Sequence, residues 1–443
     1  MSFFGAIRTR LLNAHPDHHA IARGMAWVAV FVFVGKLAGA AKEVAIAYRY
    51  GLGEEVDAYL FVFNLIIWPV GVWFSVLTVV LVPLVARIRQ TAPTELPRFR
   101  SELLGLTLIL GFALAGLGWW GLPAMVGASW TGLTPATLAM ANRMAPALAL
   151  LAAFGAVSSL FSAWMLAGGR HANTLLESVP ALVILATLLA FPGGGITPLV
   201  WGTLAGFAAH LVSLVLLLGR RGEIIRPMFS RASPQWTPFF QGFSLMLAGQ
   251  ALMSLTGILD QFFAAHQGTG AIATLSYANR ILALILGMGA MAVSRATLPV
   301  FSRAQAQGGN AARHVAMRWV GLLFGLGVVV MLLAGWVAPW GVRVLFERGA
   351  FSAQDTVRVV EVLRYGLTQL PFYFAGMVLV SLLASQGRHR VIAVVASSNL
   401  LVKLVAMTVL TPVLGINGIA LATSVMYAAT LLLLGLSVRI SEK

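Results

Sequence analysis

Apolar stretches of about 20 residues recur along almost the whole chain, and each is long enough to cross the hydrocarbon core of a bilayer as a helix. Hydrophobic residues make up 59% of the sequence and charged residues only 10%, whereas soluble domains carry about a quarter charged residues. Backbone groups inside a bilayer must be hydrogen-bonded within the protein, so these long runs predict helices rather than a barrel of short strands. The sequence therefore predicts an all-α polytopic membrane protein.

The apolar runs predict about twelve spans in two sets. A polar connection over residues 220–235 separates an N-lobe (24–219) from a C-lobe (236–438), with a cytoplasmic segment at 1–23 and a tail at 439–443. The expected spans are 24–49, 57–88, 102–126, 136–167, 172–191, 197–219, 236–265, 271–302, 314–340, 355–385, 389–411 and 416–438.

The basic residues predict the orientation of these spans. The formal net charge is +16, and most loop arginines fall in alternate loops such as 87–100 and 219–231. Lys and Arg accumulate in short cytoplasmic loops, so we expect both termini in the cytoplasm and no nucleic-acid partner. The chain has no cysteine and its eight histidines show no ligand spacing, so we expect neither a metal site nor a cofactor.

The two halves of the chain resemble each other. "MLAGGRHA" (165–172) matches "LASQGRHR" (383–390), and "GITPLVWGT" (195–203) matches "GINGIALAT" (415–423), in the same order. Such a repeat indicates a duplication. With an even number of spans in each half, the lobes would be related by a pseudo-twofold axis along the membrane normal, as in transporters that bind substrate between two lobes.

Ionisable side chains inside the spans are the candidates for function, because each costs roughly 2.5–3.5 kcal/mol to place in a membrane. Lys36 lies about eleven residues into its span, close to the midplane at a rise of ~1.5 Å per residue. Cations predominate, and Lys and Arg are the usual partners of phosphate oxygens, so we expect an anionic substrate. The deep cations are Lys36, Lys42, Arg280, Arg364 and Lys403, and the deep acids are Glu43 and Asp260.

Some of these charges have a structural alternative. Lys36 and Glu43 are seven residues apart, on nearly one face of a helix, where they could form a buried ion pair. Asp260 could pair with a neighbouring cation. Gly35 and Gly39 form a small-xxx-small step that allows another helix to approach closely.

Three segments resemble the lipid II flippase family (MurJ/MviN) of the MOP exporter superfamily. They are "GKLAGAAKEVAIAYRYGLGEEVDAY" (35–59), "LDQFFAAHQGTGAIATLSYANRI" (259–281) and "LFERGAFSAQDT" (345–356), and the resemblance extends over essentially the whole chain. It implies a V-shaped, two-lobed bundle in the bacterial inner membrane. It also implies movement of a lipid-linked peptidoglycan precursor from the inner to the outer leaflet, coupled to membrane potential or an ion gradient.

The resemblance also implies roles for particular residues. Lys36, Lys42 and Arg280 would contact the pyrophosphate and sugar head group, and Asp57 would gate or pair near the outer face. The chain departs from the family pattern near Val70, where the family has Arg, and family members usually have two further C-terminal spans. We group Glu43, Asp57 and Asp260 as residues for gating or ion coupling.

The expected partners are an undecaprenyl-pyrophosphate-linked glycan, membrane lipid, a monovalent coupling ion or the membrane potential, and enzymes of cell-wall or polysaccharide synthesis. Other functions remain open, namely flipping of another carrier-linked exopolysaccharide or O-antigen unit, multidrug/cation antiport, or a scaffold without transport. We do not expect an enzyme, because the 14 acidic residues lie mostly in loops and the sequence has no Walker loop.

Overall fold

The computed structural model describes residues 16–126, 129–169, 172–220, 222–223, 226–306 and 309–440. Within these ranges every regular element is a helix, which confirms the all-α prediction. Most of the predicted end segments, 1–23 and 439–443, lie outside the described residues.

The helices follow the predicted spans closely. Those before the polar connection are α2 (Pro16–Tyr50), α3 (Glu54–Thr91), α4 (Leu96–Gly116), α5 (Leu122–Val126), α6 (Pro135–Ala167), α7 (Ala172–Leu176), α8 (Val179–Ala190) and α9 (Thr197–Gly219). Those after it are α10 (Trp236–Ala265), α11 (Ala271–Ala306), α12 (Gly309–Phe346), α13 (Ala353–Leu367), α14 (Leu370–Ser385), α15 (His389–Leu414) and α16 (Ile416–Ile440).

In the described part of the chain, 10 helical stretches are long and apolar enough to cross a membrane. The other two predicted spans correspond to α2, which has 35 residues, and to α7 with α8. This fifth span is broken, because its apolar helix α8 has only 12 residues. The tenth span is also two helices, α13 and α14. Both breaks lie just before a proline, Pro180 or Pro371, which has no N–H to donate to the carbonyl oxygen four residues earlier. Those earlier residues, Leu176 and Leu367, are the last residues of α7 and α13.

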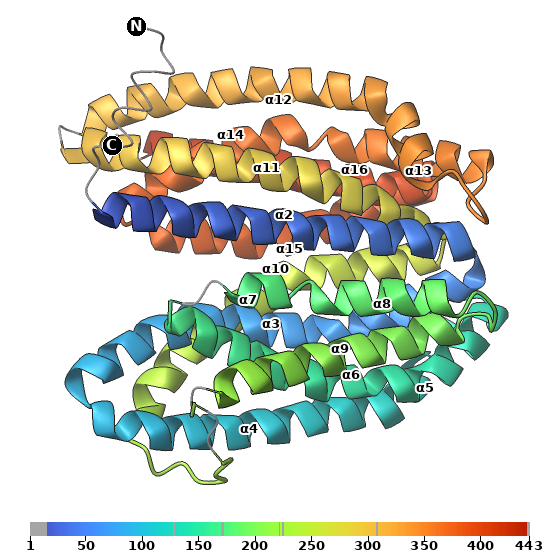
Figure 1. The fold of residues 1–443 in the computed structure, drawn as a ribbon. Helices are drawn as coiled ribbons and strands as arrows, with labels where there is room; N and C mark the ends of the chain where they lie inside the picture. Colours follow the sequence, from blue (N-terminus) through green and yellow to red (C-terminus); the bar gives the residue numbers. More distant parts are fainter. Residues whose placement is uncertain are drawn as a thin grey trace, which may run out of the picture. The chain divides into compact units, whose positions relative to one another are not determined.

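The chain forms two compact units that interleave along the sequence. One comprises residues 1–45, 77–111 and 153–239, and the other comprises 46–76, 112–152 and 240–443. In the first unit α8 and α9 lie side by side (Figure 1). In the second, α11, α12, α13, α14 and α16 pack on one another, and α15 lies along α16. The predicted division into an N-lobe and a C-lobe stays a prediction.

The connection between α9 and α10 is fastened to α4 by a buried acid. The carboxylate of Glu102 accepts hydrogen bonds from Ser230 Oγ (2.6 Å) and Trp236 Nε1 (2.6 Å). It also accepts one from the backbone N–H of Ser233 (3.1 Å). A buried carboxylate is stabilised when several donors surround it, so the connection is held against α4 up to the first residue of α10.

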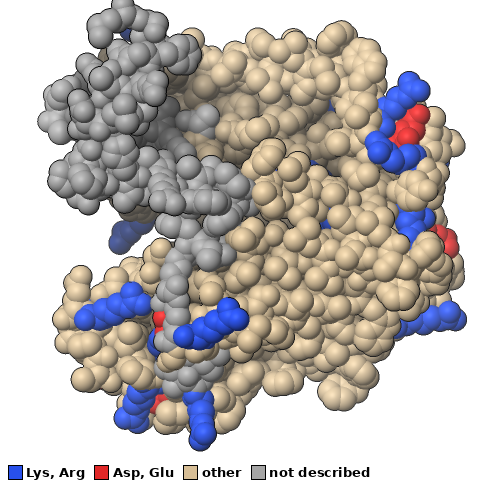
Figure 2. Space-filling view, viewed as in Figure 1, with Lys and Arg blue, Asp and Glu red and all other residues tan. Residues whose placement is uncertain are grey.

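Much of the exposed surface of the long helices is apolar. On α12, for example, the exposed side chains include Leu322, Leu332, Leu333 and Trp336. Figure 2 shows broad areas of the viewed face without charge, with charged residues near the edges where helices end in Figure 1. Continuous apolar surface of this kind marks contact with a membrane.

Candidate functional site

A polar cavity of about 600 Å³ lies among α3, α10 and α11. Helix α11 contributes Arg280, the cation predicted to bind the substrate head group. Most of the other polar groups are uncharged amides and hydroxyls. The polar residues that line the cavity are Asn64, Trp68, Ser75, Gln250, Ser254, Asp260, Gln261, Ser276, Asn279 and Arg280.

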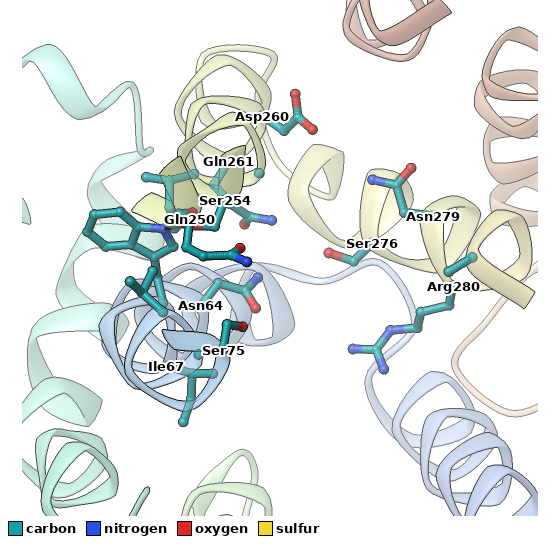
Figure 3. Close-up of a pocket in the computed structure, with 16 residues that line it drawn as sticks. Asn64, Ile67, Ser75, Gln250, Ser254, Asp260, Gln261, Ser276, Asn279 and Arg280 are labelled. Carbon is teal, nitrogen blue, oxygen red and sulfur yellow. Dashed lines mark hydrogen bonds between the residues drawn. The ribbon is translucent and has the colours of Figure 1, made fainter. Parts of the chain in front are cut away.

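The polar residues of α3 and α10 form two stripes with the same spacing. On α3 the stripe is Asn64, Trp68, Gly71 and Ser75, and on α10 it is Gln250, Ser254, Gly257 and Gln261. Steps of four, three and four residues keep side chains on one face of a helix. Figure 3 shows the labelled members of both stripes near one another. The sequence prediction missed these residues because it considered only charges, although the spacing is visible in the sequence.

One hydrogen bond joins the two stripes. The indole Nε1 of Trp68 donates to Ser254 Oγ at 2.9 Å. Close by, Gln261 is buried, and within the described residues its side-chain oxygen has no hydrogen-bond partner. Buried polar atoms usually have partners, so this oxygen is a candidate to accept a bond from a ligand hydroxyl.

Arg280 is the positively charged member of the cavity lining among the described residues. In Figure 3 its side chain extends from α11 into the space beside Ser276 and away from Asn279. A guanidinium group presents several N–H donors in a fork that matches the oxygens of a phosphate. The cavity therefore combines one site for a phosphate with several neutral groups for hydroxyls or amides.

Asp260 and Lys403 form a buried ion pair. The Nζ of Lys403 on α15 lies 2.8 Å from the carboxylate of Asp260 on α10. This agrees with the expectation that Asp260 has a cationic neighbour. Lys403, however, lines a smaller cavity of about 180 Å³ and is absent from the lining of the polar cavity. Its predicted role as a head-group ligand has no support from this position.

Two adjacent charged residues of α2, Lys42 and Glu43, pair with each other. The Nζ of Lys42 lies 2.6 Å from Oε1 of the adjacent Glu43, which is buried. The expected alternative, a pair between Lys36 and Glu43, is replaced by this contact. Lys36 is exposed. Residues 36–43 belong to a different compact unit from Arg280, so their predicted contact with the same head group stays a prediction.

Arg364 lies away from the polar cavity. It is in the last turn of α13, it is exposed, and its Nε donates to the carbonyl oxygen of Gly335 on α12 at 3.1 Å. A cation near the C-terminus of a helix is favourable without any ligand. We therefore assign Arg364 a structural contact, and its predicted role in substrate binding is not supported by its position.

Asp57 caps the start of another helix. It is buried near the start of α3, and its two carboxylate oxygens accept hydrogen bonds from the backbone N–H groups of Gly270 (2.6 Å) and Ala273 (2.7 Å). The first N–H groups of a helix lack partners within that helix and carry partial positive charge. Asp57 therefore joins the beginning of α3 to the beginning of α11, and we call this the Asp57 contact.

The turn between α2 and α3 is packed against the loop that follows α12. The backbone N–H of Ala350 donates to the carbonyl oxygen of Tyr48 at 2.7 Å. Gly349 has φ +63°, and a Cβ there would lie 2.2 Å from that same oxygen. Only glycine combines this backbone conformation with so close an approach. The segment "LFERGAFSAQDT" (345–356), one of the three that resemble the family, thus contains the residues that contact the backbone of Tyr48.

A bundle of apolar helices around a polar, cation-bearing cavity is the architecture of a membrane transporter. The fold agrees with that class. It matches an inward-facing MATE multidrug resistance transporter of the MOP superfamily with a TM-score of 0.76 and 15% identity, covering 92% of this chain and 94% of that one. More narrowly, the chain belongs to the lipid II flippase MurJ family, whose model matches residues 27–441.

Individual relatives agree with this assignment. A solved lipid II flippase MurJ in an inward closed conformation matches with a TM-score of 0.80 and 19% identity, over 93% of this chain and 87% of that one. A probable lipid II flippase MurJ of Helicobacter pylori (strain J99) is 31% identical over 200 residues, 44% of this chain and 43% of that protein. One from Buchnera aphidicola subsp. Baizongia pistaciae is 20% identical over 369 residues, 80% of this chain and 71% of that protein.

The Helicobacter pylori alignment spans less than half of that relative's length. Family membership and the apolar spans together define the chain as a multi-pass protein of the bacterial inner membrane.

Proposed function

We propose that this chain flips an undecaprenyl-pyrophosphate-linked glycan, lipid II in the first instance, from the inner to the outer leaflet. The observation that supports this most directly is the position of Arg280 in a cavity lined by amides and hydroxyls. The guanidinium would bind the pyrophosphate as a bidentate donor. The amides and hydroxyls of α3 and α10 would bind the sugar and peptide groups, since each offers both donors and acceptors.

The Asp57 contact would act as the outer gate of an alternating-access cycle. With both termini in the cytoplasm, the starts of α3 and α11 lie on the outer side. There Asp57 binds Gly270 and Ala273, and Ala350 binds Tyr48. Loss of these contacts would open the cavity outward and release the head group. Membrane potential or a counter-ion would reset the inward state, and enzymes of cell-wall synthesis would supply and consume the substrate.

The paired acids argue against a cationic drug as the substrate. A drug/cation antiporter needs a carboxylate that is available to a cation inside the membrane. Asp260 is already bound to Lys403, and Asp57 is bound to backbone N–H groups. Another carrier-linked glycan would share the pyrophosphate and could use Arg280 equally well, so the experiment has to separate the two glycans.

The test is complementation of a bacterial strain depleted of its own lipid II flippase. Expression of this chain should restore growth and the appearance of lipid II on the outer leaflet. Arg280→Ala should reduce flipping by on the order of tenfold or more, because a desolvated phosphate loses its charged partner. Arg280→Lys should retain part of the activity.

Arg343→Ala is the matched control, since Arg343 is 70% exposed at the end of α12. No rescue by the unaltered chain, when it is present in the membrane, would exclude lipid II and favour another glycan. Full rescue by Arg280→Ala would show that the cavity does not bind the head group.

A further inference from the structure

The pair of Asp260 and Lys403 is enclosed within the second compact unit. The side chain of Lys403 is 3% exposed and that of Asp260 is 13% exposed. The ammonium contacts the Asp260 carboxylate at 2.8 Å and lies 3.5 Å from the carbonyl oxygen of Thr256, one turn earlier on α10. The ammonium therefore contacts oxygen atoms of two residues of α10, while its own side chain comes from α15.

The pair borders a cavity of about 180 Å³ with neutral oxygen-bearing side chains in its wall. These are Asn279 on α11, Gln369 at the start of α14 and Thr423 on α16. Among the described residues that line this cavity, Asp260 is the acid and Lys403 is the base. One carboxylate with amide, hydroxyl and carbonyl oxygens is the ligand chemistry that hard metal cations prefer.

A carboxylate this deep among apolar helices needs a positive charge beside it. A monovalent metal ion or a side-chain ammonium can provide that charge, and a lysine ammonium is a compact point charge. We propose that Lys403 is a tethered counter-cation, which occupies the place of a monovalent metal ion at Asp260. Removal of its ammonium converts this place into a binding site for Na⁺.

The proposal has a functional consequence that goes beyond the substrate. Because the positive charge at Asp260 is part of the chain, Na⁺ does not bind there in the unaltered protein. A sodium gradient therefore cannot drive transport through this acid. The contact between α10 and α15 is the same in the presence and absence of Na⁺.

The test is thermal unfolding of the purified full chain in detergent, followed by tryptophan fluorescence. Na⁺ replaces choline at constant ionic strength, up to on the order of 100 mM. The unaltered protein should keep the same Tm. Lys403→Met, which retains the length of the side chain without its charge, should gain on the order of 3 °C or more as Na⁺ saturates the site.

The double variant Lys403→Met/Asp260→Asn is the matched control and should show no dependence on Na⁺. A saturable Na⁺-dependent rise in the unaltered protein would overturn the proposal, and so would a Tm of Lys403→Met that Na⁺ leaves unchanged. If Lys403→Met is purified as folded protein only when Na⁺ is present, the proposal is supported. Failure to fold in both ions contradicts it. These measurements involve no transported substrate, so their outcome is independent of the proposed flipping.

Discussion

Two aspartates of this protein, Asp57 buried and Asp260 only slightly exposed, are stabilised in different ways. Asp57 is bound by backbone N–H groups of α11, whereas Asp260 is bound by the side chain of Lys403. Separating Asp57 from its partners exposes one charge and two neutral donors. Separating Asp260 from Lys403 leaves two opposite charges without partners among apolar helices, which is far more costly. The Asp57 contact therefore suits a contact that breaks in every transport cycle. The pair of Asp260 and Lys403 suits a contact that stays formed throughout the cycle.

The largest expected effect is at the ion pair of Asp260 and Lys403. In choline buffer without Na⁺, Lys403→Met should lower the free energy of unfolding by about 3–5 kcal/mol, because it leaves a buried carboxylate without its cation. The double variant Lys403→Met/Asp260→Asn should recover most of this loss, because neither position then carries a charge that needs a partner. Thermal unfolding of the single and double variants measures both values. Equal stability of the two variants would contradict this interpretation of the pair.

A smaller effect is expected at the Asp57 contact. Asp57→Asn should cost about 1.5–3 kcal/mol, the usual value for hydrogen bonds to a charged group. It should also favour the outward-open state. The chain has no cysteine, so Ser276→Cys places a single thiol in the polar cavity. A membrane-impermeant maleimide added outside should label this thiol faster in the Asp57→Asn background.

Glu54→Gln is the control for that experiment. Glu54 lies one turn earlier on α3 and accepts hydrogen bonds from the hydroxyls of Thr134 and Thr269, which an amide oxygen also accepts. Its labelling rate should stay close to that of the Ser276→Cys protein. Equal labelling in all three backgrounds would show that Asp57 does not close the outer side.

A separate effect is expected at Gly349, in the loop that packs against the turn between α2 and α3. Gly349→Ala should cost about 1–2 kcal/mol from the left-handed backbone alone, and its methyl group would press on the carbonyl oxygen of Tyr48. Gly341→Ala is the matched control, because a Cβ at Gly341 meets nothing within 4 Å. A comparison of the two Tm values measures the difference. A value for Gly349→Ala as high as that of the control would mean that this turn is less closely packed than described.

The course of the chain was predictable because membrane spans depend on local hydropathy. The predicted span 236–265 coincides with α10, and 197–219 coincides with α9. The break before Pro180 was missed because the surrounding residues are apolar enough to continue a span. The break before Pro371 falls in the predicted span 355–385, whose length for a single crossing already indicated a kink. Hydropathy detects the apolar run but is insensitive to the missing backbone donor.

The site was predictable only in part. Arg280 was identified from its depth, and it does line the polar cavity. Lys403 has a similar depth, yet it binds Asp260, because depth along one helix does not reveal the partner on another. Asn64 and Gln250 were missed because uncharged amides cost less free energy in a membrane than charges, so their presence in a span is a weaker signal of function. Their helical spacing beside Ser254 could have identified them.

The Asp57 contact has a consequence for genetics. Its partners are backbone N–H groups, so the side chains at positions 270 and 273 take no part in the hydrogen bonds. Gly270 is required for a different reason, because its φ is +81° and a Cβ there would lie 2.6 Å from the carbonyl oxygen of Leu52. Residue 57 therefore has to accept these hydrogen bonds, and no side chain at positions 270 or 273 is expected to co-vary with it. Suppressors of an Asp57 substitution should arise at positions that shift the start of α3 relative to α11, and a charge exchange at the partner positions should not restore the contact.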